Sequence, residues 1–176
     1  MKIIFVCTGN ASRSAVAEVI LKKMLADEGI KDVNVTSCGT NVPEGLQREE
    51  IMSRIAAEHG YTLTGSAVHM NARLLNSADL IIVMTEHHRW EVMQLLAETP
   101  DQQTQSPHNN SPVHDMRQQL TAPRYTPNIV LFNDYCFHEP TDLPDPHYQS
   151  EYVYRTCFST IHKGCTEITR KFKSFR

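Results

Sequence analysis

A short apolar run, a cysteine, an arginine and a helical pattern follow one another at the start of this 176-residue chain. The residues Lys2–Val6 are mostly apolar and β-branched, which is typical of a buried strand. Apolar residues then recur at helical spacing over residues 14–29. Cys7 and Arg13 therefore lie in a turn between a strand and a helix N-terminus, where unpaired backbone N–H groups bind anions well. We predict a βα unit with an anion-binding turn.

A cysteine in such a turn is suited to nucleophilic chemistry. The helix dipole and the guanidinium of Arg13 favour the thiolate of Cys7, and Ser14 can donate a hydrogen bond to its sulfur. The planar fork of Arg13 can hold two oxygens of a phosphoryl group. Gly9 and Asn10 tolerate a tight or left-handed backbone. A buried structural cysteine is the alternative reading, and it leaves these neighbours unexplained.

The turn resembles the signature of the low-molecular-weight protein-tyrosine phosphatases, Cys-x-Gly-Asn-x-Cys-Arg-Ser-Pro near the N-terminus. This chain has Cys-Thr-Gly-Asn-Ala-Ser-Arg-Ser-Ala at 7–15 and a late Asp-Pro dipeptide at Asp145. The stretch 78–85 is similar to the third strand of the family. The resemblance covers most of residues 1–97 and 128–176, and the order of the elements agrees throughout.

The resemblance implies hydrolysis through a cysteinyl-phosphate, without a metal or cofactor. Cys7 is then the nucleophile, Arg13 holds the phosphoryl group, and Asp145 is the general acid and later the base that activates water. Asp142 is a competing candidate for the acid, and only the resemblance favours Asp145. The expected phosphate-binding residues are Thr8, Gly9, Asn10, Ala11, Ser12, Arg13 and Ser14.

The chain departs from the family pattern in and around the turn. Ser12 replaces the usual second cysteine, so a protective disulfide between neighbouring loop thiols is excluded for Cys7. Family members often carry Ser-His-x-Ala-Arg before the third strand, and its histidine supports the loop asparagine. The matching positions 64–68 lack that histidine, which leaves open whether His69 replaces it.

The substrate is less well determined than the chemistry. The pattern Val-Met-Thr-x-x-His at 83–88 is similar to the bacterial branch that includes protein-arginine phosphatases. There, a threonine at the position of Ala11 favours phosphoarginine and a bulkier apolar residue favours phosphotyrosine. Ala11 is neither, whereas His147 and Tyr148 occupy the positions of the aromatic cleft walls. We expect a phosphotyrosine phosphatase, with a protein-arginine phosphatase as the alternative.

Two further classes are less well supported. An arsenate reductase with the same loop needs two relay cysteines around the third strand, and residues 66–135 contain no cysteine. A non-catalytic phosphate sensor would need neither the thiol of Cys7 nor the carboxyl group of Asp145.

Composition restricts the partners and the compartment. A net charge of −3 gives no reason to expect nucleic acid or an anionic membrane. No stretch is predicted to be a signal peptide or a transmembrane span. Five cysteines without framework spacing indicate a reducing cytoplasm. The nine histidines lack metal-ligand spacing and are predicted to lie on the surface. The expected partners are a phosphorylated protein and, as product, inorganic phosphate; the oligomeric state stays open.

Alternating strands and helices predict one phosphatase domain, 1–176, with a three-layer α/β/α fold. Its four-stranded parallel sheet would carry the phosphate-binding loop after the first strand. Trp90 and Met93 are predicted to pack in the core. A segment at about 98–127 holds five of the nine prolines and is rich in Gln, Asn and Ser, so we predict a loop or partly disordered insertion. Strands are expected at 2–6, 33–37, 80–84 and 129–132, and helices at 14–29, 45–59, 85–97 and around 158–172.

Overall fold

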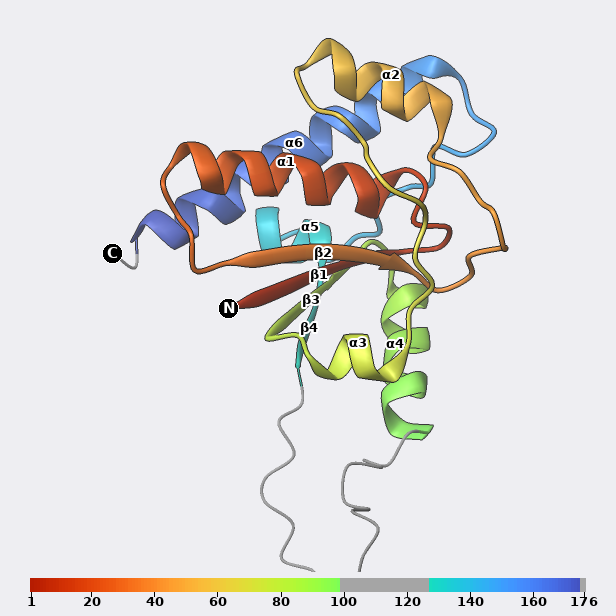
Figure 1. Ribbon diagram of the computed structural model, residues 1–176, viewed down its shortest axis with the longest axis vertical. Coiled ribbons are helices and arrows are strands. Elements are labelled where there is room, and N and C mark those ends of the chain that lie inside the picture. The colour runs from red at the N-terminus through yellow and green to blue at the C-terminus, as the bar shows by residue number, and fades with distance from the viewer. Residues whose placement is uncertain (99–126, 175–176) are drawn as a thin grey trace, which may run out of the picture.

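Four parallel strands form one sheet in a computed structural model that describes residues 1–98 and 127–174 (Figure 1). The spatial order is β2-β1-β3-β4, and Val6 lies opposite Cys38 of β2 and Val83 of β3. The predicted four-stranded parallel sheet is therefore confirmed. The strands are β1 (Lys2–Cys7), β2 (Asn34–Gly39), β3 (Leu80–Val83) and β4 (Asn128–Leu131).

Helices cover both faces of the sheet and give the predicted three layers. In Figure 1, α1, α2, α5 and α6 lie on one side and α3 and α4 on the other. Among the described residues, no helix is long and apolar enough to cross a membrane. The helices are α1 (Arg13–Asp27), α2 (Glu50–Glu58), α3 (Ala72–Asn76), α4 (Glu86–Glu98), α5 (Phe132–Phe137) and α6 (Glu151–Ser174).

The central strand β1 is buried on both faces because its side chains alternate between two cores. Ile3, Phe5 and Cys7 belong to the larger core, which includes residues of α1, α2 and α6. Ile4 and Val6 belong to the smaller core, which includes residues of α3 and α4. A strand between two helical layers must be apolar throughout, which explains its sequence. The alternation leaves Cys7 at the carboxyl end of β1, facing the larger core.

Some local predictions were wrong. Residues 45–49 are not helical, because Gly45 adopts a left-handed φ of 75° and α2 begins only at Glu50. The short helices α3 and α5 were not predicted. Trp90 and Met93 are 58% and 54% exposed, because α4 turns His88 and Val92 toward the sheet instead.

The insertion predicted at about 98–127 lies almost wholly outside the described residues. The described chain stops at Glu98, the end of α4, and resumes beside the first residue of β4, Asn128. Because the strands are parallel, the start of β4 lies at the edge of the sheet opposite the carboxyl end that carries Cys7.

The close packing of α6 against α5 can be tested at Gly164. An ideal Cβ at this position would lie 2.3 Å from Cζ of Phe132 in α5. Gly164→Ala should therefore lower the free energy of unfolding by about 1–3 kcal/mol through overpacking. Helix propensity alone predicts the opposite sign, a gain of about 1 kcal/mol. Urea unfolding measures the difference, and Ser159→Ala, at an exposed position of the same helix, should cost nothing. A stabilised Gly164→Ala variant would contradict this packing.

Candidate active site

The loop between β1 and α1 forms the floor of the site. Cys7 ends β1, and its Sγ lies 2.9 Å from Oγ of Ser14 in the first turn of α1. Ser12 precedes that helix, and its buried hydroxyl has no hydrogen-bond partner among the described residues. No acidic residue occupies the first turn of α1, so the positive end of the helix dipole is open to an anion. The neighbouring strand allows this path, because a Cβ at Gly39 would collide with the carbonyl oxygen of Thr8.

Asn10 fixes the shape of the loop from inside. Its backbone is left-handed, with φ at 52°, and its side chain is fully buried. The amide nitrogen donates to Oγ of Ser14 at 2.9 Å and to Oγ of Ser37 at 2.8 Å. The amide oxygen accepts from the backbone N–H of Val68 at 2.9 Å and from Nη1 of Arg48 at 3.0 Å. All the hydrogen-bonding capacity of the amide is therefore used to hold one backbone conformation.

Arg48 and the backbone of Val68 occupy the place expected for the missing histidine. His69 does not, since it is exposed and its Nδ1 lies 2.7 Å from the carbonyl oxygen of the adjacent Met70. Sequence reasoning missed Arg48 because it placed residues 45–59 in a helix. Gly45, a frequent helix terminator, was the available signal that the chain there is a loop.

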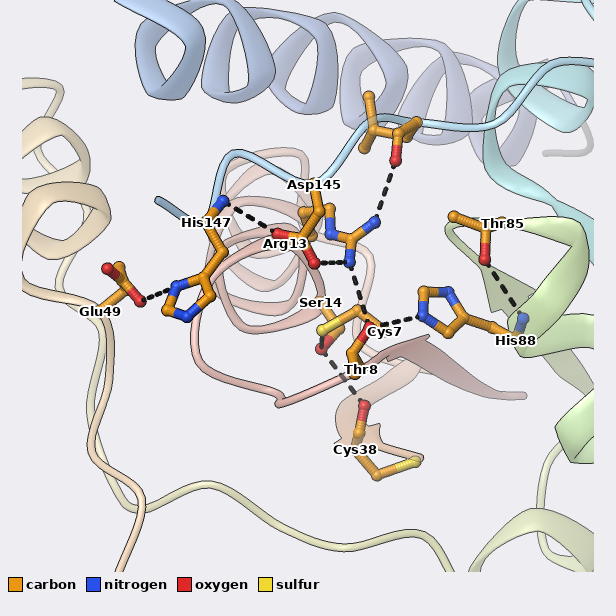
Figure 2. A network of polar contacts seen from close by, with 11 residues as sticks. Cys7, Thr8, Arg13, Ser14, Cys38, Glu49, Thr85, His88, Asp145 and His147 are labelled. Carbon is orange, nitrogen blue, oxygen red and sulfur yellow. Dashed lines mark hydrogen bonds and ion pairs between the residues drawn. The ribbon is translucent and has the colours of Figure 1, made fainter. Parts of the chain in front are cut away.

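Arg13 connects the loop to the chain near α6. Its guanidinium is almost completely buried; Nη1 donates to the carbonyl oxygen of Leu143 at 3.0 Å, and Nη2 pairs with Oδ2 of Asp145 (Figure 2). The Asp145 side chain is 44% exposed, and its Oδ1 accepts from the backbone N–H of His147 at 3.1 Å. The structure thus brings the thiol, the arginine and this carboxylate together.

Asp142, the competing acid candidate, has a different position. Its Oδ1 accepts from the backbone N–H of Glu86 at 2.8 Å, which caps the N-terminus of α4. Its carbonyl oxygen accepts from the side chain of Asn133 at 3.3 Å. Asp142 therefore holds the loop against α4, and Asp145 is the carboxylate that meets Arg13.

The two residues predicted to wall the cleft, His147 and Tyr148, follow Asp145 directly. Tyr148 is 92% exposed, and its ring centroid lies 3.8 Å from that of His147. Nδ1 of His147 lies 3.3 Å from Oε2 of Glu49. Glu49, which sequence reasoning missed, also donates its backbone N–H to the carbonyl oxygen of Ala11 at 3.0 Å. It therefore links the loop of Asp145 to the loop between β1 and α1.

His88 contradicts the prediction that the histidines lie on the surface. The ring is buried on the first turn of α4, and Nε2 lies 2.9 Å from Oγ1 of Thr8. Burial, together with the nearby charge of Arg13, lowers the pKa of His88 to about 4. The neighbouring His87, by contrast, is exposed as predicted.

The four cysteines outside the loop are buried thiols. Burial raises the pKa to about 12 for Cys38, Cys136 and Cys157, and it raises the pKa of Cys165 well above the ordinary value of a thiol. They are therefore protonated and poorly nucleophilic. In the part of the chain that the structure describes, no three His, Cys, Asp or Glu side chains are grouped as metal ligands.

Protonation of His88 should destabilise the fold in acid. An unfolded histidine has a pKa near 6.5, so the unfolded chain binds a proton that the folded chain, with its lowered pKa, resists. This contribution to stability is present above pH 6.5 and is lost as the pH falls toward about 4. His88→Gln should therefore lose less stability than the wild type between pH 7 and pH 4.5 in urea unfolding. His87→Gln should follow the wild type, and identical profiles for all three proteins would refute the assignment.

Known proteins resemble this chain in sequence and in fold. Residues 2–105 match the family of low molecular weight phosphotyrosine protein phosphatases. A protein-arginine-phosphatase of Bacillus subtilis is 37% identical over 90 residues, 51% of this chain and 59% of the relative. The protein-tyrosine-phosphatase PtpB of Staphylococcus haemolyticus is 38% identical over 95 residues, 53% of this chain and 63% of the relative.

The fold is shared over nearly the whole described chain. A mutant of YwlE from Bacillus subtilis superimposes with a TM-score of 0.78 at 24% identity, covering 98% of this chain and 99% of the other. The sequence matches to the two curated relatives span about three fifths of their length, namely 59% and 63%. From the sequence match together with the shared fold, the chain belongs to the low molecular weight phosphotyrosine protein phosphatase family.

Proposed function

We propose that this chain is a phosphoprotein phosphatase that hydrolyses phosphotyrosine through a cysteinyl-phosphate. The observation that carries the proposal is the convergence of Cys7, Arg13 and Asp145 at the carboxyl end of β1. A nucleophile, an anion-binding guanidinium and a half-exposed carboxyl group are the parts that this reaction requires. The four other cysteines are free and buried, which suits a protein of the reducing cytoplasm.

In the first step, Sγ of Cys7 attacks phosphorus while the bond from phosphorus to the tyrosyl oxygen breaks. The N–H groups of the loop and the guanidinium of Arg13 stabilise the charge on the three equatorial oxygens. Asp145, in its protonated form, gives its proton to the departing oxygen, and a phenol leaves. The hydroxyl of Ser14, 2.9 Å from Sγ, stabilises sulfur as a thiolate before attack.

In the second step, water replaces the thiolate on phosphorus. The Asp145 carboxylate takes a proton from that water, whose oxygen forms the new bond as the bond from sulfur to phosphorus breaks. Inorganic phosphate and the thiolate of Cys7 result, so no electrons are gained or lost.

Arg13 and Asp145 pair directly, and substrate binding must change this contact. The phosphoryl group of the substrate is a dianion, and one of its oxygens replaces the carboxylate at Nη2 of Arg13 when substrate binds. The carboxyl group is then free to face the leaving oxygen. The bond from the His147 N–H to Oδ1 keeps Asp145 at the rim of the site during this exchange.

A protein-arginine phosphatase is the second candidate, and one feature of the cleft favours it. Two carboxylates, Asp145 and Glu49, lie on either side of His147, and a substrate guanidinium would be attracted to them. The relative from Bacillus subtilis that is named a protein-arginine-phosphatase gives the same indication. The exposed ring of Tyr148 favours phosphotyrosine instead, because it can stack on a phenyl ring.

Matched phosphotyrosine and phosphoarginine peptides test the function directly. Under reducing conditions, the wild type should release phosphate from the phosphotyrosine peptide faster than from the phosphoarginine peptide. Cys7→Ser should abolish turnover yet still bind inorganic phosphate, because the N–H cradle and Arg13 are unchanged. Phosphate binding without turnover in the wild type would indicate a non-catalytic sensor, and faster release from phosphoarginine would select the second candidate.

The role of Asp145 is tested by comparison with its neighbour. Asp145→Asn should slow turnover by about 10²–10⁴-fold, the usual contribution of a positioned acid. Asp142→Asn should leave turnover nearly unchanged, because asparagine also caps a helix N-terminus. Steady-state kinetics on the phosphotyrosine peptide give both values. The reverse result, a harmless Asp145→Asn and an inactive Asp142→Asn, would move the acid to Asp142.

A further inference from the structure

Thr8 has an unusual position for a residue next to the nucleophile. It is exposed, whereas Cys7 before it and Asn10 after it are buried. Its Oγ1 lies 2.9 Å from Nε2 of His88 and 3.4 Å from Nη2 of Arg13 (Figure 2). The mechanism above uses the backbone of Thr8 but neither its hydroxyl group nor His88.

His88 approaches Thr8 from α4, which lies on the opposite face of the sheet from α1 (Figure 1). The backbone N–H of His88 donates to Oγ1 of Thr85 at 3.2 Å, and this N-terminal cap of α4 fixes the backbone position of His88. The ring is buried against Thr8 and is neutral at pH 7, because burial and Arg13 lower its pKa to about 4. A neutral imidazole has one N–H donor and one acceptor nitrogen.

The surroundings of the ring indicate which nitrogen carries the proton. Nδ1 of His88 is buried and has no hydrogen-bond partner among the described residues. An orphaned buried N–H group is rarer in proteins than an orphaned acceptor. The proton therefore belongs on Nε2, which donates to Oγ1 of Thr8.

This assignment determines what the Thr8 hydroxyl can do. Arg13 can only donate, so Oγ1 accepts one hydrogen bond from Nη2 and a second from His88. Both lone pairs are then occupied, and the hydroxyl proton is left to point outward. Oδ2 of Asp145 is the other acceptor at Nη2, so an anion oxygen that takes its place is held beside Thr8.

We propose that the Thr8 hydroxyl donates a hydrogen bond to a phosphoryl oxygen of the substrate, and that His88 is the positioning residue that directs it there. The inference rests on the proposed function and adds a side-chain donor to the backbone cradle. The acceptor is the phosphoryl group itself, so inorganic phosphate and a phosphotyrosine peptide are both suitable probes.

Substitution of Thr8 tests the donor. Thr8→Val removes the hydroxyl but keeps the shape of the side chain, whereas Thr8→Ser keeps the hydroxyl. Thr8→Val should weaken inorganic phosphate binding and lower kcat/KM on the peptide by about 10-fold, as expected for a hydrogen bond to a charged group. Thr8→Ser should stay within about 2-fold of the wild type in phosphate affinity and in kcat/KM. Its hydroxyl can still accept the hydrogen bond from His88 and donate one to a phosphoryl oxygen. Unchanged phosphate affinity in Thr8→Val overturns the proposal.

A double-mutant cycle tests the positioning. His88→Phe should lower kcat/KM by a factor similar to Thr8→Val, and it should have almost no further effect in the Thr8→Val background. His88→Gln, whose amide nitrogen can still donate to Thr8, should retain most of the activity. His87→Phe, at the exposed neighbour on the same helix, is the matched control and should leave activity unchanged.

Two outcomes separate this inference from the proposed function. If His88→Phe reduces kcat/KM equally with and without the Thr8 hydroxyl, His88 acts only through packing and its positioning role is refuted. If the wild type turns over neither peptide, the proposed function fails. The affinity of Thr8→Val for inorganic phosphate still decides whether the hydroxyl binds the anion, because that measurement needs no catalysis.

Discussion

The rest of the site depends on one buried cation. The guanidinium of Arg13 lies at the base of α1 with its side chain almost fully buried, and a buried charge is costly unless its N–H groups are paired. Its partners, Leu143 and Asp145, belong to the chain just before α6. The charge that we propose binds phosphate therefore also holds the late loop against the early one. Loss of Arg13 would disturb the position of Asp145 as well as the proposed anion site.

The parts of the molecule that follow from local patterns could be predicted from the sequence. The apolar run of β1 and the helical spacing after it placed Cys7 and Arg13 correctly in a strand–turn–helix unit. Such features depend on neighbours in the chain. The parallel sheet followed from the repetition of strand and helix, because short crossovers admit few other arrangements.

The supporting residues could not be predicted because they act over long separations in the chain. Arg48 reaches Asn10 from a loop that resembles the start of a helix, and Glu49 reaches His147 from the same loop. Asp142 and Asp145 have similar sequence surroundings, and only the packing of the first against α4 distinguishes them. His88 sits beside an exposed histidine, and nothing in the pair indicates which ring faces the sheet.

The connection between α4 and β4 meets the described part of the chain at Glu98 and next to Asn128. Cys7, Arg13 and Asp145 meet at the carboxyl edge of the sheet, whereas β4 begins at its amino edge. A change in the length of the connection between α4 and β4 is therefore expected to leave the candidate active site in place. For an engineer, the same connection is the place to try inserting a reporter domain or an affinity tag, because it meets the sheet at the edge opposite the candidate active site.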